Sequence, residues 1–239
     1  AQLGIKPDEL LHYAERENTR HEHLEVLRKL YRYEMFKGKR VKQMRAWLDQ
    51  NAEGAQSSEG LVRAFVQECR GRHIILPGTT VMERMCADAL VAAERRIETR
   101  ITARLDRAMR ARLDGLLNEE AEGRTTTFVL LRQFEPGKNS ADINRRLDRL
   151  EFLKAIALAP EIMDDIPAHR VTRLRRQGER YFAKGLRDIT SDRRLAILAV
   201  CVVEWSAAIA DTVVETHDRI VGSVWRDAKR ICDARVTEA

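Results

Sequence analysis

Apolar residues recur along this chain at steps of three and four, the spacing of one face of an α-helix. A capping box at Thr19–Glu22 followed by such a stripe predicts a helix that ends near Tyr33. The stripe consists of Leu24, Leu27, Leu30 and Tyr31. Similar patterns predict helices over 42–55, from Ser57 through Cys69, and over 80–117 with one interruption.

The second half of the chain is also predicted to be helical. The pattern indicates a helix from Ser140 through Ile156, a basic helix over 168–187 and a long C-terminal helix over 191–233. Two short apolar stretches are ambiguous: 128–134 is predicted as a helix in preference to a strand, and 73–78 as a packed connection. The expected fold class is all-α, built from multi-helix bundle modules.

Composition supports the helical prediction, because Gly, Pro and aromatic residues are scarce. An acidic segment with Gly123 resembles a surface linker, which divides the chain into an N-terminal module at 1–118 and a second module at 124–239. The net charge of +6 and the 34 Arg against 9 Lys suit a polyanionic partner. A basic globular protein with no nucleic-acid role can have the same net charge. A GC-rich genome would give the same excess of Arg over Lys.

Sequence signatures of catalysis are not found. There is no nucleotide-binding or nucleophile motif, so no catalytic residue and no cofactor are expected. His21 and His23 would point about 200° apart on a helix, which argues against a shared metal ion. The four cysteines form no Cys-x-x-Cys pair, as expected for buried thiols in a reducing cytoplasm.

Membrane insertion and secretion are not expected either. The first residues lack a signal-peptide pattern. The most apolar stretch, 195–214, contains Glu204 and Asp211, which is typical of a buried helix in a protein without a membrane span. No small-molecule substrate is expected.

Two basic stretches are candidates for phosphate contact. Residues 16–45 carry 10 Lys or Arg against 4 Asp or Glu. In the helix over 168–187, cations recur every three to four residues with Glu179 as the one acidic residue, whereas ordinary surface helices intersperse acids. A third patch, around Arg145, Arg146 and Arg149, is balanced by acids and is expected to be structural.

Residues 65–91 have the outline of a helix-turn-helix. The turn is 75–79, and Thr79, Thr80 and Arg84 stand at the start of the second helix, where recognition helices present side chains to base edges.

Several strings, taken in order, are similar to the N-terminal region of the Tn-3 family of cointegrate-forming, replicative transposases. They are Ala14–Leu24, Arg72–Pro77, Cys86–Arg96, Asn139–Asn144, His169–Gly178 and Val214–Ile220. The resemblance implies a helical region that binds double-stranded DNA at the terminal inverted repeats of a transposon, in the bacterial cytoplasm at the nucleoid. It also implies that a metal-dependent DDE strand transferase lies elsewhere in a longer protein, and that the chain begins inside the first DNA-binding module.

Charge and helical face, read with this resemblance, give the DNA-binding candidates. In the first module they are Arg16, Arg20, Lys37, Lys39, Arg40 and Lys42, with Thr80 and Arg84 as base readers. In the second module they are Arg170, Arg173, Arg176 and Arg180. The alternative is a scaffold module that pairs two subunits into a homodimer through the long last helix, with only nonspecific DNA contact.

Overall fold

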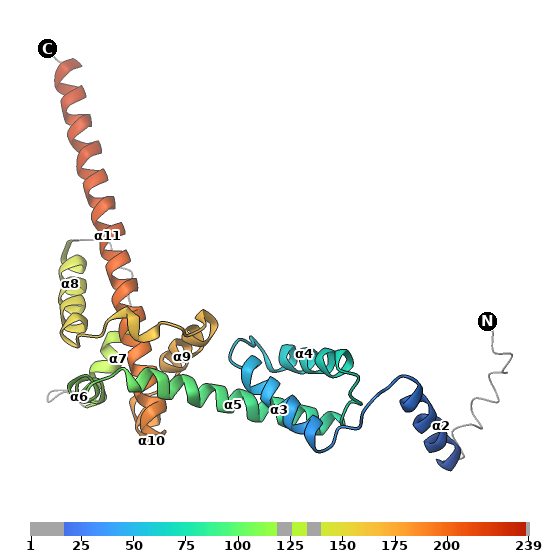
Figure 1. The fold of residues 1–239 in the computed structure, drawn as a ribbon. Coiled ribbons are helices and arrows are strands. Elements are labelled where there is room, and N and C mark those ends of the chain that lie inside the picture. Colours follow the sequence, from blue (N-terminus) through green and yellow to red (C-terminus); the bar gives the residue numbers. More distant parts are fainter. Residues whose placement is uncertain (1–16, 119–125, 133–139, 238–239) are drawn as a thin grey trace. The chain divides into compact units, whose positions relative to one another are not determined.

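The computed structural model describes residues 17–118, 126–132 and 140–237, with side chains described outside 17–20, 140–142 and 234–237. These residues form α-helices and a short 3-10 helix, and Glu34 and Ile74 form an isolated β-bridge. The predicted all-α class is therefore confirmed (Figure 1). The chain divides into two compact units, 1–94 and 95–239. The helices are α2 (Glu17–Leu30), α3 (Lys39–Asn51), α4 (Ser58–Gly71), α5 (Thr79–Ala103), α6 (Arg107–Gly115), α7 (Thr127–Arg132), α8 (Ser140–Ala155), η1 (Pro160–Met163), α9 (Ala168–Arg180), α10 (Ala183–Asp188) and α11 (Ser191–Thr237).

The core of the first unit lies between α3, α4 and the first half of α5. Phe65 of α4 is fully buried at its centre, with Phe36 and Trp47 edge-on to its ring. Burying a side chain of this size contributes about 1.5–3 kcal/mol. Met44 and Leu48 from α3 and Met85 and Cys86 from α5 complete this core.

A short connection fastens the segment before α3 to the end of α4. The amide of Glu34 donates to the carbonyl of His73 at 2.8 Å, and the amide of Ile75 donates to the carbonyl of Glu34 at 2.9 Å. Ile74 is buried between them. The stretch over 73–78 is therefore a packed connection, as predicted.

Helix α2 exposes the apolar stripe from which it was predicted. It begins at Glu17, two residues before the expected cap, and the apolar residues of the stripe are exposed. Leu24 is 53% exposed and Leu30 is 69% exposed. The periodicity correctly predicted a helix, but within the described residues this face has no apolar partner.

The second unit is organised around the first half of α11. Leu195–Val203 is buried along its whole length, where α11 packs against α8, α9 and α6. Phe128 of α7 is buried against Trp205 at 5.2 Å between ring centroids. The apolar stretch 128–134 is helical as far as Arg132, as predicted, and residues 133–134 lie outside the described part of the chain.

The division between units differs from the predicted boundary at 118–124. Leu113, Leu116 and Leu117 belong to the core of the second unit, together with Ile97 and Ile101 from the end of α5. Residues 119–125 of the predicted linker lie outside the described part of the chain, and packing places α6 with the second unit. Asp106, whose carboxylate accepts from the amide of Met109 at 2.7 Å, caps α6 at the expected interruption of the long helix.

The basic helix predicted over 168–187 is divided into α9 and α10 by Tyr181 and Phe182, which have extended backbones. One guanidinium, that of Arg132, donates to the carbonyls of Glu179 and Tyr181, both at 2.9 Å, and so caps the end of α9. A tertiary contact therefore ends this helix.

Helix α11 is long and apolar enough to cross a membrane by length and composition alone, the one such helix among the described residues. Its most apolar part, Leu195–Val203, is buried inside the second unit. A core helix shows the same length and composition, and the burial favours that explanation.

Candidate nucleic-acid interface

The start of α3 presents three lysines to solvent. Lys37, Lys39 and Lys42 are exposed and surround a helix N-terminus that has no acidic residue in its first turn. Gly38 occupies the N-cap position with φ of 50°, a conformation that glycine adopts without strain. Positive side chains and the positive end of the helix dipole together attract an anion.

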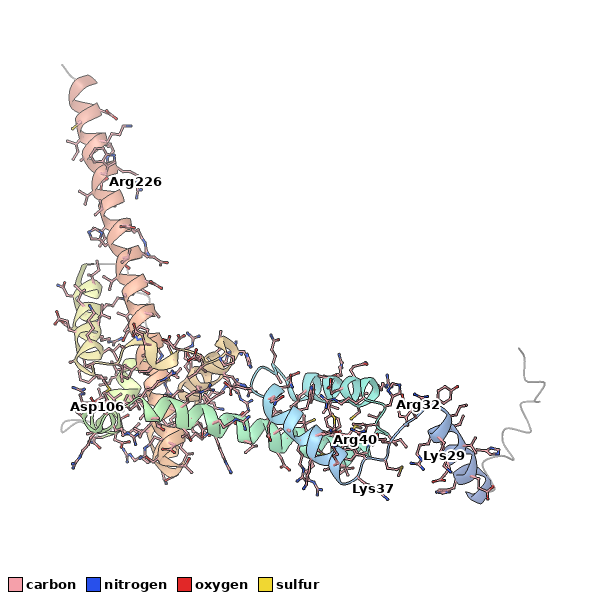
Figure 2. All side chains as sticks on the ribbon, viewed as in Figure 1. Lys29, Arg32, Lys37, Arg40, Asp106 and Arg226 are labelled. Atoms are coloured by element: carbon pink, nitrogen blue, oxygen red, sulfur yellow. The ribbon has the colours of Figure 1, made fainter. Side chains whose placement is uncertain are left out.

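Arg40, predicted as part of the same cluster, is already engaged. Its guanidinium forms a two-pronged ion pair with the carboxylate of Glu34, and its Nη1 donates to Oε1 of Gln43 at 2.7 Å. The hydrogen bond from Arg40 holds the pKa of Glu34 below its usual range. Arg40 therefore fixes the backbone before α3, a role that the charge pattern alone did not reveal. Figure 2 shows Lys37 and Arg40 along this segment.

Two predicted residues at the N-terminal end cannot be placed. Arg16 lies outside the described residues, and Arg20 lies within α2 with its side chain outside the described part.

The start of α5 presents Thr80 and Arg84 on one face. Both side chains are exposed and four residues apart, one helical turn along the axis. Helix α5 begins at Thr79, so Thr80 lies inside its first turn. Ala87 and Val91 continue the same exposed face, and small apolar groups there suit contact with thymine methyls.

A groove of about 780 Å³ runs between α3 and α5. Its lining includes Arg45 and Arg84, together with Asp49, Asp88 and Phe36. The acids offset the arginines, so the groove is less attractive to phosphate than the lysines of α3. Arg45 was not among the predicted residues, although it follows Lys42 by one helical turn.

Helix α9 carries the basic surface of the second unit. Arg173, Arg176 and Arg180 are exposed and three to four residues apart, so they share one face. The acidic residue of this helix, Glu179, pairs with Arg175 at 3.4 Å. The side chains of Arg176 and Arg180 are exposed, and neither has an ion-pair partner among the described residues.

The fourth member of the predicted stripe, Arg170, is a correction. Its side chain is only 3% exposed, because Arg170 lies on the same face of α9 as the buried Leu174 and Gly178. Buried guanidinium groups hold the fold and do not reach a phosphate backbone. The regular spacing of cations predicted a single face, but only Arg173, Arg176 and Arg180 lie on the exposed side of the helix.

Many other arginines of the second unit bind within the protein. Arg104 donates to the carbonyls of Ile162 and Asp164 at 2.9 and 2.7 Å, and Arg194 pairs with Asp114 at 2.9 Å. Arg146, expected to be structural, is 5% exposed and donates to the hydroxyl of Thr216 at 3.1 Å. High Arg content in this chain therefore serves packing as well as surface charge.

Among residues 17–118, 126–132 and 140–237, no three His, Cys, Asp or Glu side chains are grouped to hold an ion. Cys69, Cys86 and Cys201 are buried, and burial raises the pKa of each thiol.

Comparison with known proteins shows what this chain is similar to. Residues 1–89 match a family model described as a domain of unknown function, DUF4158. The transposase for transposon Tn2501 of Escherichia coli is 31% identical over 231 residues, which is 96% of this chain. The transposase for Tn501 of Pseudomonas aeruginosa is 31% identical over 95% of this chain. The transposase for Tn1546 of Enterococcus faecium is 27% identical over 93% of it.

The chain is a relative of the Tn-3 family transposases. It matches 23% of the length of each of these three relatives, so it spans under a quarter of the length of the relatives it matches. The matched residues include both units and therefore both basic surfaces. The family model ends at residue 89 and so falls within the first unit, whereas the similarity to the transposases continues through α9 and into α11.

Proposed function

We propose that this chain binds the terminal inverted repeats of a transposon and has no catalytic role of its own. In this proposal a longer protein carries out replicative transposition in the bacterial cytoplasm at the nucleoid, with a metal-dependent DDE strand transferase in another part. The chain itself requires no cofactor to hold DNA. The similarity to Tn-3 family transposases and the exposed cations of both units support this assignment.

The observation that carries the proposal is that Arg176 and Arg180 are exposed on α9 and have no ion-pair partner among the described residues. Surface helices normally intersperse acids with arginines, and α9 uses its acidic residue to neutralise Arg175. Two guanidinium groups on one face, four residues apart, suit adjacent phosphates of one DNA strand.

The first unit adds two kinds of contact. The first-unit lysines, Lys37, Lys39 and Lys42, supply positive charge for the phosphates of DNA. Such contacts position the protein on the DNA backbone but do not read the base sequence. Thr80 and Arg84 project from the first turns of α5, the second helix of a helix-turn-helix outline formed with α4. Arg84 is the candidate for bidentate contact with a guanine edge.

A salt series tests whether these cations contact phosphate. Fluorescence anisotropy measures the dissociation constant for a labelled duplex of the transposon end between about 50 and 200 mM salt. If five lysine and arginine side chains neutralise phosphates, the log–log slope is about −4 to −5. A log–log slope near zero would show that neither unit contacts phosphate.

A further inference from the structure

Phe182 is the most exposed phenylalanine among the described residues. It stands between α9 and α10 and is 73% exposed. A single exposed apolar side chain is common on protein surfaces and by itself indicates nothing. Three features of its surroundings set Phe182 apart, namely the backbone that carries it, an arginine that holds it and the cations beside it.

The backbone turns the Phe182 side chain away from the core. Tyr181 and Phe182 both have extended backbones, in which successive side chains point in opposite directions. Tyr181 packs against the core of the second unit, and its Cδ1 lies 3.1 Å from the position that a Cβ on Gly185 would occupy. Because the ring of Tyr181 points inward, the ring of Phe182 points outward.

Arg132 of α7 holds this outward position. Its side chain is half-buried, and its guanidinium donates to the carbonyls of Glu179 and Tyr181, both at 2.9 Å. The same guanidinium lies over the ring of Phe182 in a cation–π contact, with its central carbon 5.9 Å from the ring centroid. The backbone and one face of the ring are therefore held, while the rest of the ring is open to solvent. A side chain that is ordered before binding loses little entropy when it binds.

Three cations flank Phe182 along the chain. Arg176 and Arg180 precede it and Lys184 follows it, and all three side chains are exposed. The acidic residue of α9 is paired within its own helix. An apolar protein partner would have to bury or neutralise the three cations, whereas DNA offers phosphates to the cations and a flat base to the ring. Charge complementarity therefore favours nucleic acid as the occupant of this corner.

A single ring beside phosphate-binding cations suits a duplex better than a single strand. Surfaces that hold single strands carry several aromatic side chains on which successive bases stack. Here Tyr181 points inward, so the corner offers one ring. One apolar side chain that enters a base step, unstacks it and bends the duplex is a common device of proteins that bind double-stranded DNA.

We propose that Phe182 wedges into one base step of the transposon-end duplex whose phosphates Arg176 and Arg180 contact, and that it bends the DNA there. This inference rests on the proposed function and adds a specificity-determining residue to it. Opening a base step costs least at flexible steps such as TA and CA/TG. Phe182 therefore selects DNA by its deformability, without a hydrogen bond to any base edge.

Bending is measured by resonance energy transfer between dyes at the two ends of a transposon-end duplex. The whole wild-type chain is expected to raise the transfer efficiency, because a bend of about 20–90° brings the two ends closer. Phe182→Ala is expected to abolish this rise and to weaken binding about fivefold or more, through loss of one base–aromatic contact. Its log–log salt slope stays unchanged, because the cations remain.

Two further variants control the experiment. Phe182→Leu keeps an apolar wedge and is expected to retain most of the bend. Phe152→Ala removes another exposed phenylalanine of the second unit, which is 44% exposed on α8, and is expected to change neither the bend nor the affinity. Circular dichroism checks that each variant keeps its helices.

The outcomes separate the wedge from end binding itself. Failure of the wild-type chain to bind the end duplex would overturn the proposed function and the wedge together. Equal transfer efficiency for the wild-type chain and Phe182→Ala, both bound, would leave end binding intact and overturn the wedge. Tighter binding of the wild-type chain to the corresponding single strand than to the duplex, lost in Phe182→Ala, would show stacking on unpaired bases and would also overturn it.

Discussion

Gly178 of α9 lies directly against Cys201 of α11, so closely that a Cβ on Gly178 would come within 2.3 Å of the Cys201 sulfur. The two helices make the most extensive contact in the second unit, and the missing side chain allows it. The same close approach fixes which face of α9 turns inward. It leaves Arg176 and Arg180 on the outside.

Gly178→Ala is expected to destabilise the second unit by about 1–3 kcal/mol, because the added methyl overpacks a filled core. Urea unfolding followed by circular dichroism measures the change. Gly115→Ala is the matched control, since nothing lies within 4 Å of a Cβ at Gly115. Combining Gly178→Ala with Cys201→Ala removes the nearest atom and should recover part of the loss. Equal costs at Gly178 and Gly115 would contradict this packing.

Arg170 and Arg176 are expected to respond oppositely to truncation. Arg170 is buried, so Arg170→Ala should lower the free energy of unfolding by about 1–3 kcal/mol. Arg176 is exposed, so Arg176→Ala should leave that free energy within about 0.5 kcal/mol. Chemical denaturation of both variants makes the comparison. A stable Arg170→Ala protein would show that the guanidinium is not part of the core.

Thiol labelling should distinguish one cysteine from the other three. Burial raises the pKa of Cys69 to about 11, so at pH 8 that thiol is almost entirely protonated and does not react as thiolate. Cys86 and Cys201 are also buried with raised pKa values, whereas Cys232 is exposed. Ellman's reagent is expected to modify one thiol rapidly in the folded chain and four after denaturation. Rapid modification of a second thiol would mean that one of the cores opens.

The double variant Arg176→Ala, Arg180→Ala should weaken binding to any duplex and reduce the log–log salt slope by about 2. The reason is that two fewer phosphates release their counterions. Arg107→Ala, Arg112→Ala removes the same charge from exposed positions on α6 and should leave the slope unchanged. If both double variants reduce the slope equally, the effect comes from net charge and not from contact by α9.

Arg84→Ala should reduce discrimination between DNA sequences more than it reduces affinity for DNA in general. Loss of one bidentate base contact costs about 1–3 kcal/mol on the matching site and little elsewhere. Lys37→Ala is the comparison, because loss of a phosphate contact weakens binding to every duplex alike. Anisotropy titrations on end and scrambled duplexes separate the two effects. An equal loss of affinity for both duplexes would show that Arg84 does not contact base edges.

Periodicity predicted the helices well, because steps of three and four in apolar residues reflect burial of one helix face. Leu195 and the residues that follow it were expected in a core and are found there. Periodicity does not say whether a face has a partner: the stripe with Leu24 and Leu30 predicted a helix correctly, yet both side chains of α2 are exposed. The end of α9 was also missed, since it depends on Arg132, far away in the sequence.

The spacing of charged residues identified the candidate surfaces, but it did not show which cationic side chains are exposed and which are buried or paired within the protein. Arg170 and Arg176 look alike in the sequence, and only the direction of α9 against α11 separates them. Arg40 looked like part of a lysine cluster, yet Glu34 binds it, because the bridge to Ile74 fixes Glu34 beside it. The sequence shows where charged residues are concentrated, and tertiary packing decides which of their side chains face solvent.

The most direct test of the central claim compares two duplexes of equal length and composition at about 150 mM salt, a transposon end and its scrambled counterpart. Recognition of the inverted repeat predicts that this chain binds the end at least about tenfold more tightly, since each matched base pair is worth about 1–3 kcal/mol. Equal affinity for the two duplexes would contradict end recognition by this chain.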